Sequence, residues 1–170
     1  MIGPNIIFSG ANIHIVSGSG STADNGNPTG LGNLIIGYDE DPTLPISNPS
    51  NPPLGPGDRG GSHNLVIGSF NRFTQAAFGG FVAGERNIIE GTGASVLGGF
   101  HNTANRSFSS VSGGSFNFAS GSDASILGGQ SNTASGDEAT VCGGNGNTAF
   151  CLRTPSATAS ATPQLEVQRS

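Results

Sequence analysis

The residues with the chemistry for catalysis are few in this sequence, and no regular spacing relates them. The three histidines, His14, His63 and His101, lie far apart, each in a different part of the chain. No serine lies in a GxSxG sequence with suitable flanks, and the absence of lysine excludes a P-loop. The sequence therefore predicts no enzyme, no cofactor and no metal site.

Two short acidic segments are the places where a cation could bind. The run Asp39–Asp41 precedes a proline, and Asp137 and Glu138 end a turn between two repeats. Both patterns are typical of solvated turns. The calcium-binding repeat GGxGxD has no copy here, because the pair Gly98–Gly99 is followed by phenylalanine, histidine and asparagine. We therefore expect solvated turns rather than a calcium ladder.

Composition narrows the class of protein further. Glycine supplies 29 of the 170 residues, and charged residues make up only 10%, against usual shares of roughly 7% and 25%. The net charge is −5, and the six basic residues are scattered arginines that form no basic stripe. We expect no nucleic-acid partner and no binding to anionic membranes. No apolar run approaches the roughly 20 residues that span a bilayer, so we expect no membrane insertion.

A structural repeat of 15 residues extends from Gly79 to Phe150. Each copy has an apolar residue, a glycine and an asparagine at fixed places. The columns are Phe81, Val96, Val111, Ile126 and Val141; Gly84, Gly99, Gly114, Gly129 and Gly144; and Asn87, Asn102, Asn117, Asn132 and Asn147. Each copy fits a short strand that ends in a turn. The repeat predicts an all-β fold, a parallel β-roll or β-solenoid with 15-residue coils and a ladder of stacked asparagine amides.

The second face of the repeating strand is also uncharged. Neighbouring side chains of a strand point to opposite faces, so the column after the apolar one must face away from the coil interior. This outward column reads Val82, Leu97, Ser112, Leu127 and Cys142. A 15-residue coil has one interior, and another copy of the chain is the economical cover for its second face. We therefore expect an obligate oligomer with parallel roll axes, in which Val82, Leu97, Leu127 and Cys142 are interface candidates.

The two cysteines leave three alternatives open. Cys142 could be a small hydrophobe in the apolar column, could form a disulfide with Cys151, or could cross-link two chains.

The repeats divide the chain into four segments. Residues 1–37 are expected to form an N-terminal cap and the first coils, because Gly32–Tyr38 is an early copy of His63–Ser69. Residues 38–62 contain a proline-rich stretch that predicts a long surface loop, the expected specificity element. Residues 63–150 form the β-roll, and residues 151–170 form a C-terminal tail.

Aromatic residues occupy several turn positions. They are Phe70, Phe73, Phe100, Phe108, Phe116 and Phe118. Packing at chain boundaries is the favoured interpretation, and an exposed stacking surface for a sugar or a protein is the alternative. A partial threonine column at Thr103, Thr133 and Thr148 is interrupted by Phe118, which makes it a poor ice-binding array.

Three stretches of the repeat resemble a known family. SVLGGFHNTA (95–104), SVSGGSFNFASG (110–121) and SILGGQSNTASG (125–136) are similar to head repeats of trimeric autotransporter adhesins and to SVSGG-NTASG repeats of bacterial surface proteins. The resemblance covers residues 64–150 strongly and 30–38 weakly. It implies a homotrimer of left-handed parallel β-rolls on an extracellular fibre that contacts surfaces. Four coils carry a Gly-Gly pair where the common head repeat has one glycine.

The expected function is therefore a structural and adhesive module of a trimeric bacterial surface fibre. We expect it at the cell surface or outside the cell, as part of a longer exported chain or by another route, with a host-surface protein or glycan as partner. A phage or viral tail-fibre segment is the alternative. A glycan-binding or glycan-cleaving solenoid is less favoured, because such enzymes need wider coils and a charged catalytic cluster on one face.

Overall fold

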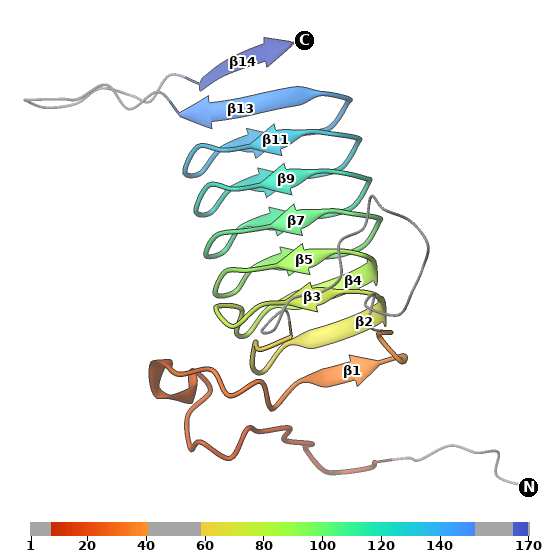
Figure 1. The fold of residues 1–170 in the computed structure, drawn as a ribbon, viewed down its shortest axis with the longest axis vertical. Helices are drawn as coiled ribbons and strands as arrows, with labels where there is room; N and C mark the ends of the chain where they lie inside the picture. The colour runs from red at the N-terminus through yellow and green to blue at the C-terminus, as the bar shows by residue number, and fades with distance from the viewer. Residues whose placement is uncertain (1–7, 41–58, 152–164, 170) are drawn as a thin grey trace, which may run out of the picture.

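The computed structural model describes residues 8–40, 59–151 and 165–169, and it is an all-β, parallel β-solenoid of about six turns (Figure 1). Consecutive coils stack along one axis, and each complete coil gives one strand to each of two sheets. The predicted parallel β-solenoid with 15-residue coils is confirmed, because strands in successive coils pair in parallel at 15-residue intervals from β6 onward.

The strands of the two sheets alternate along the chain. The first sheet contains β1 (Leu34–Ile36), β2 (Leu65–Ser69), β4 (Phe81–Glu85), β6 (Ser95–Val96), β8 (Ser110–Val111), β10 (Ser125–Ile126) and β12 (Thr140–Val141). The second contains β3 (Arg72–Phe73), β5 (Ile88–Ile89), β7 (Thr103–Ala104), β9 (Phe118–Ala119), β11 (Thr133–Ala134), β13 (Asn147–Cys151) and β14 (Leu165–Arg169). All these pairings are parallel except that of β13 with β14.

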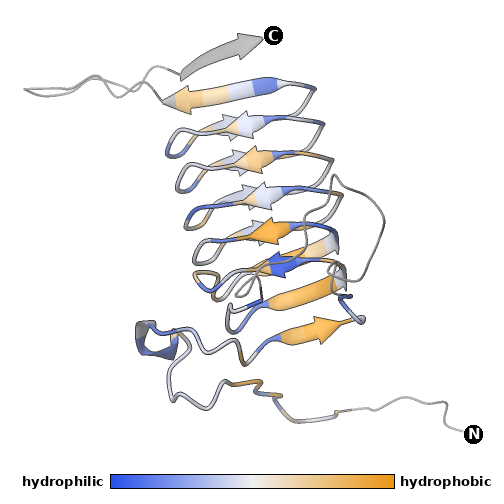
Figure 2. Ribbon diagram, in the orientation of Figure 1, coloured by the Kyte–Doolittle hydropathy of each residue, from blue (hydrophilic) through white to orange (hydrophobic). Residues whose placement is uncertain are grey.

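The core is a narrow strip between the two sheets. The first sheet contributes valine or isoleucine from every coil between β2 and β12, and the second contributes mainly alanine. The buried members are Val66, Val82, Val96, Val111, Ile126 and Val141 on one side, and Phe73, Ile89, Ala104, Ala119, Ala134 and Ala149 on the other. In Figure 2, β1 and β2 are orange whereas the Thr-Ala strands β7 and β11 are pale. Half of the buried apolar side chains are alanines, so each coil buries little apolar area.

The predicted asparagine ladder is confirmed. The side-chain oxygen of Asn87 accepts the backbone N–H of Asn102 at 2.8 Å, and that of Asn102 accepts the N–H of Asn117 at 3.0 Å. The side-chain amide of Asn102 also donates to the carbonyls of Gly98 in its own coil and Gly114 in the next, at 3.1 and 2.9 Å. The ladder thereby satisfies polar groups that would otherwise be buried without partners.

The second glycine of each Gly-Gly pair is required by geometry. Gly99 has a φ of +88°, in the left-handed region, and a Cβ built there would lie 2.1 Å from the carbonyl oxygen of Gly114. Gly98 differs, because a Cβ there would meet nothing within 4 Å. Gly98 therefore fills a place that another residue could fill, whereas Gly99 lets the backbones of successive coils approach each other.

The alignment of one coil was wrong by one residue. Val82, not Phe81, pairs with Val96, and Val82 is fully buried in the core. Val82 is therefore no interface candidate, and Ala83 follows it on the outer face as Leu97 follows Val96. The cause is Gly98, which adds one residue between the strand and the glycine that recurs in every coil. The coil of β4 has a single glycine, Gly84, at this place, so it is one residue shorter.

Asp39 is buried, so the prediction of a solvated turn is wrong for this residue. Its Oδ1 accepts the N–H of Asn71 at 2.8 Å, and the Asp39 side chain thus forms the N-terminal end of the asparagine ladder. Its Oδ2 lies 3.4 Å from Nη2 of Arg59. Burial raises the pKa of this carboxyl, and the hydrogen bond from Asn71 and the charge of Arg59 act in the opposite direction.

The segments outside the regular coils are partly described. The early copy Gly32–Tyr38 contains β1, which pairs with β2 in the predicted register, Leu34 opposite Leu65. The proline-rich stretch 41–58 of the predicted loop lies outside the described residues.

At the C-terminal end, β14 lies antiparallel to β13, so part of the expected tail adds a strand to the second sheet. Among the described residues, no helix is long and apolar enough to span a membrane.

Candidate functional site

The outer face of the first sheet carries exposed leucines. Strand alternation directs Val96 into the core and Leu97 outward, and the exposed fractions are 0% and 56%. Leu127 is 57% exposed one repeat beyond Ser112, and Cys142, the last member of this column, is also exposed. The face predicted to contact other chains is therefore open in a single chain.

The neighbouring outward column of the same sheet is small and uncharged. It contains Ser95, Ser110, Ser125 and Thr140, in register along the sheet. The hydroxyls of Ser110 and Ser125 lie 3.0 Å apart and share a hydrogen bond. Because these side chains are small, the leucines protrude from the face. The face carries no charge in this column, which lowers the free-energy cost of removing the face from water.

Of the three alternatives for the cysteines, a disulfide between Cys142 and Cys151 has no support on the side of Cys142, which is a free thiol in this structure. Cys151 is the last residue of β13, and its side chain lies outside what the structure describes.

A stack of planar side chains lies along one corner between the two sheets. The guanidinium carbon of Arg86 lies 4.7 Å from the centre of the Phe70 ring and 5.8 Å from that of Phe100. The rings of His101 and Phe116 are parallel within 8°, with centres 5.3 Å apart. Phe100 meets both rings edge-on, at 4.6 and 5.6 Å. This corner stack comes from residues in successive coils, so the repeat itself aligns them.

Electrostatics keeps the corner stack close to neutral. Arg86 forms an ion pair with Glu85, its sequence neighbour. Burial lowers the pKa of His101, and the positive charge of Arg86 lowers it further. His101 is consequently a neutral stacking ring at neutral pH. Of the remaining aromatic turn residues, Phe73 is buried in the core, whereas Phe108 and Phe118 are exposed.

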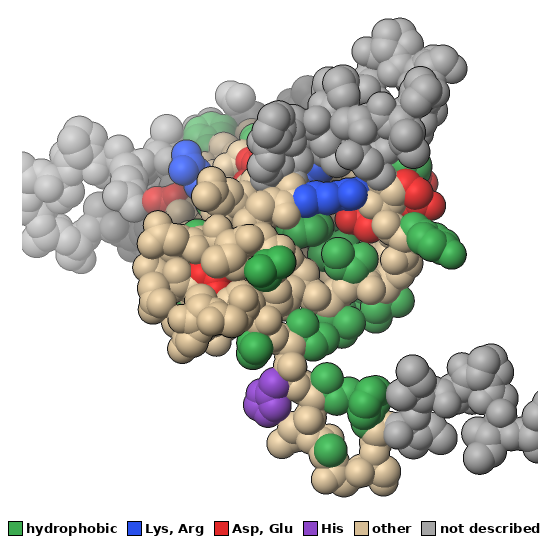
Figure 3. All heavy atoms as spheres, turned by 60° about the horizontal axis from the view of Figure 1, so that its bottom comes forward, with side chains coloured by type: hydrophobic (Ala, Val, Ile, Leu, Met, Phe, Trp, Pro, Cys, Tyr) green, Lys and Arg blue, Asp and Glu red, His purple; other side chains and the backbone are tan. Residues whose placement is uncertain are grey.

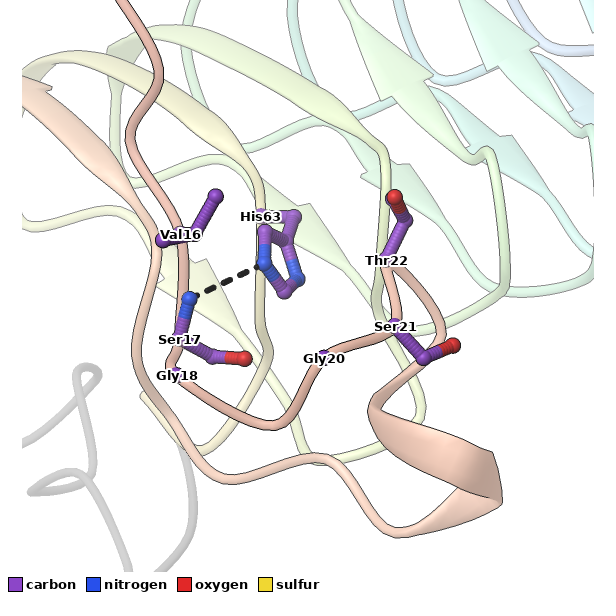
Figure 4. A pocket seen from close by; sticks show the side chains of 7 residues that line it. All are labelled: Val16, Ser17, Gly18, Gly20, Ser21, Thr22 and His63. Atoms are coloured by element: carbon purple, nitrogen blue, oxygen red, sulfur yellow. Dashed lines mark hydrogen bonds between the residues drawn. The ribbon is translucent and has the colours of Figure 1, made fainter.

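A second assembly of polar groups ties the N-terminal segment to the first coils. A hollow of about 390 Å³ is lined by Val16–Gly18, Gly20–Thr22 and His63 (Figure 4). Nε2 of His63 accepts the N–H of Ser17 at 3.2 Å, and its Nδ1 lies 4.0 Å from Oδ1 of Asp24. Asp24 is buried and is the first residue of the short 3-10 turn η1 (Asp24–Gly26).

This assembly does not form a nucleophile–base pair. The hydroxyl of Ser17 donates to Asp24, not to His63, and the hydroxyl of Ser19 donates to the same carboxylate oxygen at 2.7 Å. Hydrogen bonds, first from Ser17 and then from Ser62 and Ser19, hold the pKa of Asp24 well below its ordinary range. The imidazole nitrogen that a serine would need already accepts a backbone N–H. The arrangement is a structural clasp, in which His63 has a role that sequence spacing did not indicate.

The other residues considered for chemistry stay apart. His14 is exposed in the N-terminal segment, and His101 belongs to the corner stack. Within residues 8–40, 59–151 and 165–169, no group of three His, Cys, Asp or Glu side chains could hold a metal ion. Figure 3, with the N-terminal end forward, shows few charged side chains, with basic and acidic ones side by side.

Comparison of the chain with protein-family models, with curated proteins and with solved structures gives no match. The candidate site must therefore be judged on its own geometry.

Proposed function

We propose that this chain is a structural and adhesive module of an extracellular fibre, in which three copies associate through the outer face of the first sheet. The exposure of Leu97 and Leu127 carries the proposal. A strand whose two faces are both free of charge is typical of strands buried on both sides. Only one of those faces is covered within a single chain.

The energetics of a thin coil favour association. The interior consists largely of alanine and valine, which bury less area than the leucines and phenylalanines of ordinary cores. Burying a leucine fully contributes about 1.5–3 kcal/mol relative to leaving it exposed. The leucines are already about half covered, so each gains less than that, but every copy in an assembly contributes two of them.

The number three and the display role rest on the repeat resemblance. The stretches around Val96, Val111 and Ile126 resemble head repeats of trimeric adhesins, whose coils stack along a fibre. A rigid rod without catalytic machinery is suited to holding a contact surface away from its base. Attachment would then depend on several weak contacts acting together, because linked sites raise the effective concentration of one another.

Surface attachment can be tested with coated beads. Beads carrying the wild-type chain and beads carrying Leu97→Ser/Leu127→Ser are passed over mucin-coated glass and over epithelial cell monolayers under flow. Serine is the residue that the repeat itself has at Ser112 in this column, so the variant should fold. We expect the wild-type beads to be retained and the variant beads to be washed off. Equal retention of both kinds of bead would contradict the proposal.

A further inference from the structure

The corner stack stops partway along the repeat. Its column, one residue before the asparagine ladder, reads Phe70, Arg86, His101, Phe116, Ser131 and Gly146. The first four members are planar groups, whereas the next two coils have serine and glycine at the same place. Phe116 is therefore the last ring of the stack, and it remains 51% exposed. The stack ends in a step with an aromatic ring on one side and small residues on the other.

Polar side chains without charge surround this step. Gln130 and Asn145 continue the adjacent column that begins with Glu85 and Phe100, as the parallel bridges from coil to coil show, and both are exposed. The amides therefore lie in the two coils that follow Phe116. Gln130 lies one coil beyond Phe116 and Asn145 two coils beyond it, and each side-chain amide offers donors and an acceptor.

A second exposed aromatic ring, that of Phe118, lies on the second sheet. Phe118 follows Phe116 by two residues, and both rings are exposed whereas Asn117 between them is buried. Phe118 is 39% exposed, and its partner in the next coil is Thr133, which supplies a hydroxyl. Each ring has a small polar residue at the equivalent position of the following coil, Ser131 for Phe116 and Thr133 for Phe118.

We propose that this step, formed by Phe116, Phe118, Gln130 and Asn145, binds a neutral pyranose unit of a glycan. A pyranose ring has an apolar C–H face that packs on an aromatic ring and hydroxyls that exchange hydrogen bonds with amide side chains. Binding sites for small ligands commonly combine these two features, an apolar surface and a few placed polar groups. The positions of the step carry no charge, which favours a neutral sugar over an anionic one.

The sugar site would act in surface attachment only if the proposed function, assembly into a fibre, is correct. An assembly whose contacts are confined to the outer face of the first sheet leaves the corner and the second sheet accessible. Each fibre would then present one such step per chain, and weak individual affinities would add through multivalency.

The test uses substitutions that the repeat already contains. Phe116→Ser places the residue of the next coil, Ser131, at a position with nearly the same φ, +57° against +55°. Phe118→Thr likewise introduces the residue found at Thr103 and Thr133. The matched control is Phe108→Asp, which removes an exposed phenylalanine from another turn and introduces the residue found at Asp123, with φ values of +56° and +58°.

The probes are methyl β-galactopyranoside, methyl β-glucopyranoside and N-acetylglucosamine, with sialyllactose and a phenylalanine-containing peptide for comparison. Binding is measured by saturation-transfer NMR on the wild-type chain, on the double variant Phe116→Ser/Phe118→Thr and on the control Phe108→Asp. We expect at least one neutral pyranose to bind, Phe116→Ser/Phe118→Thr to weaken it by about tenfold, and Phe108→Asp to leave it unchanged.

Three results would overturn the assignment: no binding of any neutral sugar at millimolar concentration, equal binding by the double variant, or preference for the anionic sugar or the peptide. The solution mass of the same samples separates this inference from the proposed function. A trimer that binds no sugar contradicts only the sugar site, whereas a monomer contradicts the proposed assembly.

Discussion

The side-chain oxygen of Asn117 accepts the backbone N–H of Asn132 at 3.0 Å, while Asn117 donates its own N–H to the side chain of Asn102 at the same distance. One residue type thus links three coils. Side chains and backbone form a continuous ladder that holds the stacking direction, independent of the small apolar core.

Asn117→Ala should destabilise the protein strongly. The side-chain amide of Asn117 donates to the carbonyls of Gly113 and Gly129, each at 3.0 Å, and its loss leaves these groups and the N–H of Asn132 without this partner. Leaving a buried polar group unpaired costs about 1–3 kcal/mol. We expect urea unfolding to show a loss of about 2–4 kcal/mol. The exposed Ser131→Ala is the control, and a similar effect of both changes would mean that the ladder is not stabilising.

The two glycines of one pair should respond differently to alanine. A Cβ at Gly114, whose φ is +85°, would lie 2.0 Å from the carbonyl oxygen of Gly129, whereas a Cβ at Gly113 would meet nothing within 4 Å. Gly114→Ala should therefore lower the free energy of unfolding by at least about 2 kcal/mol. Gly113→Ala should change it by less than about 0.5 kcal/mol. Equal thermal stability of the two variants would refute the close approach of the coils.

Val82 and Ala83 provide a test of the corrected register. Val82 is fully buried in the core strip, and Ala83 follows it on the outer face. Val82→Ala should cost about 2 kcal/mol through the cavity that it leaves. Ala83→Ser should be nearly neutral in denaturant titrations of the isolated chain. If Ala83→Ser proves the more destabilising change, the register of the structure is wrong and Phe81 pairs with Val96 as the sequence predicts.

Asp39 should make the stability depend on pH. Burial raises the pKa of its carboxyl above the ordinary value of 3.8, so the folded state holds this proton more tightly than the unfolded state does. The stabilisation is fully present below pH 3.8 and is lost as the pH rises through the raised pKa. Unfolding free energies of the wild type minus those of Asp39→Asn, measured across this range, should fall with increasing pH. A difference that rises with pH would show that Arg59 outweighs burial.

The repeat allowed the coil, its core column and the asparagine ladder to be predicted. Identical residues every 15 positions must occupy equivalent places when parallel strands stack, so Val96, Val111 and Ile126 were assigned to the interior from sequence alone. The one error in this region came from Gly84. A coil with a single glycine has one residue fewer between its strand and that glycine. An alignment on the glycines therefore places Phe81 in the core column, where the structure has Val82.

The contacts outside the repeat could not be predicted in the same way. The clasp of Ser17, Asp24 and His63 joins residues up to 46 positions apart in a segment without internal repetition. Asp39 was assigned to a solvated turn because acidic residues before a proline usually lie there. Its burial follows from its place beneath Asn71, which only the stacking of the first coils reveals. The aromatic turn residues were open to two interpretations, because the repeat places Phe116 at a turn but does not give its neighbours.

The solution mass of the wild-type chain, measured by light scattering on a size-exclusion column at two concentrations, tests the central claim most directly. Burial of Leu97 and Leu127 between copies predicts a mass near three times the 16.9 kDa of one chain, unchanged on dilution. A stable species of 16.9 kDa at both concentrations would contradict the account, because the exposed leucines would then belong to a free surface.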